Sequence, residues 1–242
     1  MKLVHRSSEQ GITTLTLDSP HNRNALSSRL VAELLEGLAE AAEDAGTRAV
    51  LLSHAGNTFC SGADLRETGT DGPQALVRLM RAVVELPKPV VARVNGHVRA
   101  GGLGLLGSCD ISVAGEASSF AFTEARLGLA PAVISLPLLP RLDARAAARY
   151  YLTGERFGAA EAVRIGLVTA EEQDLGPVLD GLRRGSPQGL AESKALATAD
   201  VRRAFDRDTA RLTELSARLF GSAEAREGMT AFLERREPEW TR

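Results

Sequence analysis

The stretch NGHVRAGGLGLLGSCD, residues Asn95–Asp110, decides how the rest of this chain is interpreted. It follows the run VVARV, whose β-branched residues predict a buried strand, and it is compact, apolar and rich in glycine. Glycine permits backbone conformations that turn peptide N–H groups outward, and a helix starting after such a turn adds the positive end of its dipole. The stretch therefore predicts a turn and a helix whose first amides can face a ligand.

A second glycine loop, FCSGADL at Phe59–Leu65, also follows an expected strand. Two such turns can hold one oxygen atom between their amides. Removing a single preorganised N–H donor from such an arrangement costs roughly 3 kcal/mol of transition-state stabilisation. On loop composition alone, two ordinary strand-to-helix turns are the simpler interpretation, because glycine is common in turns of every kind.

Outward from these loops, strand and helix patterns alternate. The first helix is expected to be capped by Ser27, with one apolar stripe buried. Pro87 and Pro89 are expected to end the next helix. The expected strands are Leu3–Arg6, Ile12–Leu17, Ala49–Leu52, the VVARV run, Ile111–Ala114 and Phe120–Phe122. This alternation predicts an α/β core.

The sequence changes character after Ser135, where helical patterns follow one another without strand partners. The expected helices are Arg145–Leu152, Ala159–Ile165, Gly189–Ala199, Val201–Phe220 and Ala223–Arg235. No low-complexity linker and no solenoid-like repeat separates them from the core. We expect these helices to pack on the core or on another subunit.

Composition excludes several classes of function. The chain carries 29 Lys and Arg against 31 Asp and Glu, so no global field favours nucleic acid or an anionic membrane. Charged residues or proline interrupt every apolar run before it reaches the roughly 20 residues of a membrane span. Neither the cysteines, Cys60 and Cys109, nor the four histidines have metal-ligand spacing, and the N-terminus has no apolar signal core. These features predict a cytoplasmic protein without a bound metal.

Five runs together resemble the ordered motifs of the crotonase (enoyl-CoA hydratase/isomerase) superfamily. They are NRNALS (Asn22–Ser27), FCSGADL, VNGHVRAGGLGLLGSCD, FAFTEARLGLAP (Phe120–Pro131) and EGMTAFLERREPEW (Glu227–Trp240), and they span nearly the whole chain. The resemblance implies a crotonase-like spiral of ββα units in residues 1–190 and a helical C-terminal trimerisation region in residues 191–242. It also implies a homotrimer or a dimer of trimers that processes acyl-CoA thioesters and stabilises an enolate.

By resemblance, the N–H groups of Ala63 and Gly101 form an oxyanion hole for the thioester oxygen. Coenzyme A enters as part of the substrate, and no other cofactor is implied. The resemblance assigns further substrate-binding positions to Arg23, Ala25, Asp64, Leu65, Arg66, Phe232 and Arg235, the last two from a neighbouring subunit. Arginine suits phosphate because its planar fork stays charged, although each of these arginines alone is equally compatible with solvated surface charge.

Glu124 matches the family's catalytic glutamate in FAFTEARLG. A carboxylate flanked by Phe120, Phe122 and Leu127 is expected to have its pKa raised by desolvation, and such a group can take up and return a proton. The competing interpretation is a glutamate that caps a helix or pairs with Arg126 at the rim.

The chain departs from the best-known hydratases at Gly104, where they carry a second glutamate three residues after the oxyanion glycine. Two carboxylates divide the work of hydration, whereas one carboxylate fits migration of a double bond more simply. Two further departures are LGLAPAVIS (Leu127–Ser135), where the family often has a glycine-rich turn, and a short segment at Val168–Lys194. The acyl group and its length are therefore left open.

Two rival functions remain to be weighed. Gly102, Gly104 and Gly107 spell GxGxxG, as in nicotinamide dinucleotide sites, but residues 97–100 intervene between the expected strand and these glycines. The second rival is a non-catalytic acyl-CoA-binding homologue, which would have no need of Glu124. Nucleophilic roles for Cys60, Cys109 or Ser61 are disfavoured, since no histidine is near either cysteine and Ser61 lacks a GxSxG elbow.

Overall fold

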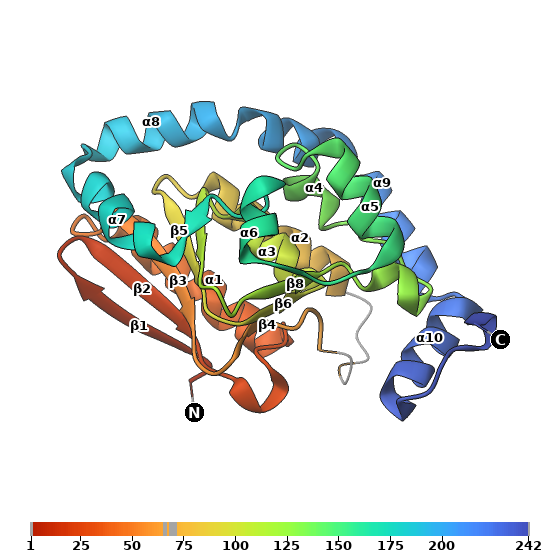
Figure 1. Ribbon diagram of the computed structural model, residues 1–242. Coiled ribbons are helices and arrows are strands. Elements are labelled where there is room, and N and C mark those ends of the chain that lie inside the picture. Colours follow the sequence, from red (N-terminus) through yellow and green to blue (C-terminus); the bar gives the residue numbers. More distant parts are fainter. Residues whose placement is uncertain (1, 65–66, 68–71, 242) are drawn as a thin grey trace.

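The computed structural model describes residues 2–64, 67 and 72–241 (Figure 1). Its first half repeats one unit, two strands followed by a helix, three times, and then adds two more strands. The units are β1 (Val4–Glu9), β2 (Ile12–Leu17) and α1 (Ser28–Glu43); β3 (Ala49–His54), β4 (Thr58–Cys60) and α2 (Gly72–Glu85); β5 (Val90–Val94), β6 (His97–Arg99) and α3 (Gly101–Ser108); and finally β7 (Ile111–Ala114) and β8 (Ser119–Ala121). This repetition is the expected spiral of ββα units.

The two strands of each later unit belong to different sheets. The larger sheet has the order β1-β2-β3-β5-β7-β10, with β10 formed by Ala170–Glu171. The smaller has the order β4-β6-β8-β9, with β9 formed by Phe157–Gly158. Among the strand pairs of the described residues, β1–β2 and β8–β9 are antiparallel and the others are parallel. Successive units therefore lay their strands side by side, and equivalent loops come to lie at the same sheet edge.

Local sequence explains the first helix. The Ser27 side chain accepts a hydrogen bond from the Leu30 N–H (3.3 Å) and caps α1, as its position predicts. The buried side of α1 is an apolar stripe made by Leu30, Val31, Leu34, Leu38 and Ala41. Burial of this stripe against the larger sheet fixes the orientation of the helix.

The C-terminal half is mainly helical, as expected. Its helices are α4 (Ser135–Leu138), α5 (Ala144–Thr153), α6 (Ala159–Arg164), α7 (Leu175–Arg184), α8 (Pro187–Ala197), α9 (Ala199–Phe220) and α10 (Ala223–Glu234). The sequence did not predict α4 or α7, and the expectation that this half lacks strands was wrong, because β9 and β10 each add two residues to a sheet. No helix in the described ranges is long and apolar enough to cross a membrane.

A buried ion pair between Lys194 and Asp110 connects α8 to the ββα core. The Lys194 ammonium lies 2.8 Å from the Asp110 carboxylate and donates hydrogen bonds to the carbonyls of Val83 (2.8 Å) and Lys88 (3.0 Å). Its side chain is only 2 % exposed. Burial raises the pKa of Asp110 and lowers that of Lys194, so each charge depends on the other. The proposed boundary after residue 190 falls within α8, and the division into two regions stays a prediction.

We expect Lys194→Met to lower the free energy of unfolding by roughly 3–5 kcal/mol, because it leaves a buried carboxylate without its cation. Urea unfolding monitored by circular dichroism measures this change. The matched control is Arg203→Met, which removes the cation of the exposed Arg203–Asp200 pair and should change stability by less than about 1 kcal/mol. Equal losses in the two variants would contradict the assigned role of the buried pair.

Candidate active site

Three loops meet at one edge of the smaller sheet. Strands β4, β6 and β8 are parallel neighbours, and their register pairs Cys60 with Val98 and Arg99 with Ala121. Their carboxyl ends therefore lie side by side, about 5 Å apart from strand to strand. The loop that contains Ala63 follows β4, Gly101 follows β6 and Glu124 follows β8. This is the edge of a parallel sheet at which ligands commonly bind.

The first loop turns at Gly62, which has a φ of 98°. The Leu26 N–H donates to the Gly62 carbonyl (2.8 Å), and Leu26 and Ala63 form an isolated parallel bridge. The Gly62 carbonyl and the Ala63 N–H belong to the same trans peptide and point in opposite directions. Because the carbonyl points to Leu26, the Ala63 N–H points away from Leu26. That N–H donates to no other backbone group of the described residues. It is available to bind an acceptor atom.

The second loop turns at Ala100, whose φ of 46° is unusual for a residue with a side chain and costs of order 1–3 kcal/mol. Gly101 comes next and begins α3, so its N–H has no partner within the helix. A methyl group placed on Gly62 would lie 2.9 Å from Ala100 Cβ and 3.2 Å from the Gly101 nitrogen. The two loops are thus in direct contact, and only a glycine fits at residue 62.

The segment that precedes α1 holds the first loop in place. The Ser61 N–H donates to the Arg23 carbonyl (3.1 Å), and the Asn22 side-chain amide donates to the Asp64 carboxylate (3.1 Å). Ala25 is buried, whereas Arg23 is exposed. The structure therefore brings together four of the expected substrate-binding positions: Arg23, Ala25, Ala63 and Asp64. Leu65 and Arg66 lie outside the described residues.

Glu124 is a buried carboxylic acid, with 8 % of its surface exposed. It begins the 3₁₀ turn η2 (Glu124–Leu127), and its Oε2 atom is buried without a hydrogen-bond partner among the described residues. Burial raises the pKa of Glu124 from 4.5 to about 7, and its own backbone N–H lowers it by less. Arg126 donates instead to the Thr153 carbonyl (2.9 Å), and within the described part of the chain it forms no ion pair with Glu124. Such a carboxyl can both lose and return a proton near neutral pH.

Tyr151 lies close to Glu124 and was not expected from the sequence. Its ring packs against Phe122 with centroids 4.7 Å apart, and its hydroxyl lies 3.2 Å from the Ser135 hydroxyl. Burial raises the pKa of Tyr151 and the charge of Glu124 adds to this effect, which places the two groups within electrostatic reach. Tyr151 is one of many residues on a helix face with no motif of its own, so no sequence signal marked it.

Helix α10 carries the two remaining positions and packs on η2. A methyl group on Gly228 would lie 2.5 Å from the Leu127 carbonyl carbon, and one on Gly128 would lie 2.6 Å from that of Glu224. Phe232 is 56 % exposed, and Arg235 caps the helix with a left-handed φ of 56°. The structure thus places Phe232 and Arg235 on a helix seated behind the turn of Glu124. Their contribution to a neighbouring subunit's site stays a prediction.

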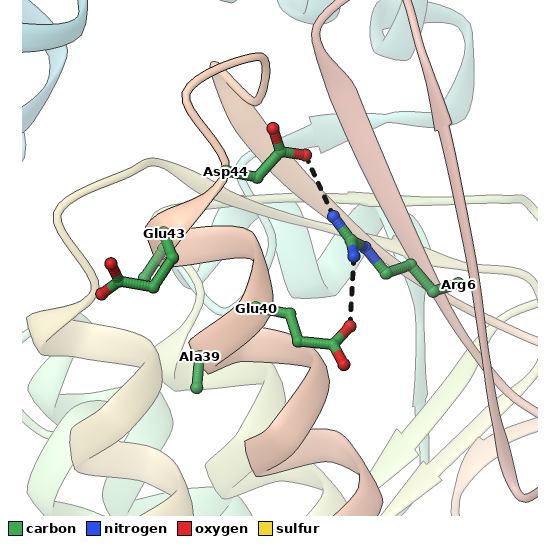
Figure 2. Close-up of a pocket in the computed structure, with 6 residues that line it drawn as sticks. Arg6, Ala39, Glu40, Glu43 and Asp44 are labelled. Carbon is green, nitrogen blue, oxygen red and sulfur yellow. Dashed lines mark hydrogen bonds and ion pairs between the residues drawn. The ribbon is translucent and has the colours of Figure 1, made fainter.

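Two hollows elsewhere on the chain do not suit an anionic thioester. One, of about 830 Å³, lies beside the end of α1, and Figure 2 shows Arg6 there bound to Glu40 (3.1 Å) and Asp44 (3.0 Å). With Glu43 it holds more carboxylates than cations, so phosphate would be repelled. The other, about 160 Å³, is lined by Ser53, His54, Arg93 and Asn95. The Arg93 guanidinium in this hollow already donates hydrogen bonds to Glu172.

Comparison with known proteins shows the family to which the chain belongs. The family model described as "Enoyl-CoA hydratase/isomerase" matches residues 7–242. The chain belongs to the enoyl-CoA hydratase/isomerase family. An enoyl-CoA hydratase from Mycobacterium avium has the same fold, with a TM-score of 0.93, 56 % identity and 98 % of each chain covered.

Two further members of this family, with different named activities, are about equally similar to the chain. The "1,2-epoxyphenylacetyl-CoA isomerase" of Escherichia coli strain K12 is 31 % identical and covers 100 % of this chain and 99 % of its own. The "Mevalonyl-coenzyme A hydratase sidH" of Aspergillus fumigatus is 30 % identical, covering 95 % of this chain and 91 % of its own. Overall similarity therefore supports an enzyme of the hydratase/isomerase family without deciding between the two reactions.

The GxGxxG pattern has a structural explanation in this family's fold. The expectation that residues 97–100 separate the strand from these glycines was wrong, because His97–Arg99 form strand β6 and α3 follows it closely. The three glycines nevertheless lie inside α3, where they are buried, and each is packed against a neighbouring residue. A methyl on Gly102 would lie 2.6 Å from the Cys60 carbonyl oxygen, and one on Gly107 would lie 2.6 Å from Leu138. These glycines serve close packing and do not face a phosphate.

The remaining candidates give no support for other chemistry. Burial raises the pKa of both Cys60 and Cys109 to about 12, so neither thiol is ionised at neutral pH. Within the described part of the chain, no group of three or more His, Cys, Asp or Glu side chains is arranged to hold a metal ion.

Glu124 should make stability depend on pH. The pKa of Glu124 is about 7 in the folded protein and 4.5 in the unfolded chain. The pH-dependent part of its contribution to the free energy of unfolding is therefore fully present below pH 4.5 and is lost as pH rises through 7. The shift corresponds to a change on the order of 3 kcal/mol. We expect the stability of Glu124→Gln relative to the unaltered protein to rise between pH 4.5 and 8, as measured by urea unfolding. The exposed Glu214→Gln is the control, and a flat difference for Glu124→Gln would refute its burial.

Proposed function

We propose that this chain is an acyl-CoA enzyme that stabilises a thioester enolate and uses Glu124 as its single acid and base. The observation that carries the proposal is the meeting of three parallel strand ends, which places two glycine turns and a buried carboxyl at one edge. In this proposal the N–H groups of Ala63 and Gly101 bind the thioester oxygen. The dipole of α3 adds to the stabilisation of a negative charge there.

We further propose that the reaction is migration of a double bond. The Glu124 carboxylate removes a proton from the carbon between the thioester carbonyl and the double bond of a 3-enoyl-CoA. The electron pair delocalises onto the thioester oxygen as a dienolate. Glu124 then returns its proton to the far carbon, which gives the 2-enoyl thioester and restores the carboxylate. Gly104 supports this reaction over hydration, because no second carboxyl is present at that position to activate water.

The alternative of a non-catalytic binding protein is less consistent with Glu124. A buried carboxyl without a hydrogen-bond partner destabilises the fold, and a protein that only binds thioesters gains nothing from it. The cytoplasmic location and the homotrimer or dimer of trimers stay predictions from the sequence.

The test is turnover of a panel of 2-enoyl-CoA and 3-enoyl-CoA thioesters. Liquid chromatography separates the double-bond isomers, and mass spectrometry detects hydration as the gain of one water. We expect Glu124-dependent isomerisation, with Glu124→Gln reducing kcat by about 10²–10⁴-fold and Glu214→Gln without effect. Binding of the thioesters without any turnover that Glu124→Gln alters would favour the binding protein. Rapid formation of a 3-hydroxyacyl product would favour hydration.

A further inference from the structure

The position of the missing second carboxyl is filled by apolar atoms. Gly104 lies one turn after Gly101 on α3, so a side chain there would project on the same face as the proposed oxyanion donor. A methyl group built on Gly104 would lie 2.7 Å from Ile134 Cγ2 and 2.7 Å from Met80 Sδ. Carbon atoms do not approach that closely. No residue larger than glycine fits at this position unless Ile134 and Met80 move.

Ile134 is the less movable of these two neighbours. Its Cβ, which is fixed to the backbone, would lie 3.0 Å from the added methyl group, whereas Met80 presents the far end of a flexible chain. Ile134 is 3 % exposed and stands immediately before α4. The next residue, Ser135, donates from its hydroxyl to the Pro131 carbonyl (2.5 Å) and from its N–H to the Ala132 carbonyl (3.0 Å). This turn holds Ile134 over the start of α3.

The contact also leaves no place for an ordered water. A buried water needs two to four polar partners. The side chains of Ile134 and Met80 offer none, and the Gly104 carbonyl already accepts a hydrogen bond from the Ser108 hydroxyl (2.8 Å). Leu76 and Leu26 continue the apolar surface, since a methyl group on Gly101 would lie 3.2 and 3.4 Å from their side chains. The described surroundings of Gly104 on this side of α3 are therefore apolar.

We propose that Ile134, supported by Met80, is the specificity-determining residue that excludes water and restricts this site to proton transfer. The inference rests on the proposed function and extends it to the source of reaction specificity. The two departures in the sequence, Gly104 and the AVIS segment that contains Ile134, then form one unit, because the side chain of one occupies the space vacated by the other. Removing Ile134 and supplying a carboxyl at residue 104 should open a hydration path.

A stability cycle tests the contact on its own. Gly104→Ala should lower the melting temperature by roughly 3–10 °C through overpacking. In an Ile134→Gly background, the same change should cost less than half as much. Gly107→Ala is the matched control, because a methyl there meets Leu138 at 2.6 Å, and its penalty should be unchanged by Ile134→Gly. Equal penalties for Gly104→Ala in both backgrounds would overturn the proposed contact.

The activity test compares the unaltered protein with Gly104→Glu, Ile134→Gly and the double variant, each on 2-enoyl-CoA and 3-enoyl-CoA thioesters. The double variant should hydrate 2-enoyl-CoA at least about tenfold faster than the unaltered protein, and faster than either single variant. If the folded double variant gains no hydration, the specificity role of Ile134 is overturned, whatever the stability cycle shows.

Failure of the proposed function would be seen elsewhere in the same experiment. In that case the unaltered protein would turn over none of the thioesters, or would turn them over no faster than Glu124→Gln does. The gain of hydration by the double variant is judged separately from that result.

Discussion

The contact between the Gly62 turn and the start of α3 is the constraint on which the rest of the site depends. Gly62 lies so close to Ala100 and to the Gly101 nitrogen that a β-carbon cannot be added, and the strained Ala100 sets the direction in which α3 begins. Two amides from distant parts of the chain become neighbours in this way. Preorganised donors of this kind need no rearrangement when negative charge develops, which is why they are effective in catalysis.

The carboxyl beside these loops is held mainly by packing. Among the residues that the structure describes, no cation stabilises the ionised form of Glu124, and burial raises its pKa. Its turn is held between α5 and α10, where Gly128 and Gly228 allow backbone-to-backbone contact with α10. The C-terminal helices therefore act on the chemistry indirectly, because they shield the acid from water and fix the turn that carries it. In Figure 1, α8 and α9 cover the core, and α10 extends away from it.

The sequence predicted the parts of this arrangement that local pattern encodes. The α/β core, the Ser27 cap, most of the helices and the buried setting of Glu124 could be inferred from apolar spacing and glycine, whereas the ββα order followed only from the resemblance to the family. Strands β4 and β6, with three residues each, are too short to show a period, so the meeting of the loops at one sheet edge could not be inferred from pattern. The packing of Ile134 on Gly104 joins residues thirty positions apart and follows only from the fold. The same holds for Tyr151.

The central claim is that the Ala63 and Gly101 amides bind the same oxygen atom. A crystal structure of the protein with a non-reactive acyl-CoA analogue tests it most directly. We expect the thioester oxygen to lie within about 2.7–3.1 Å of both nitrogens, with the acyl carbons next to the carboxyl of Glu124. A thioester oxygen bound elsewhere, or amides that point to different partners in the complex, would contradict it.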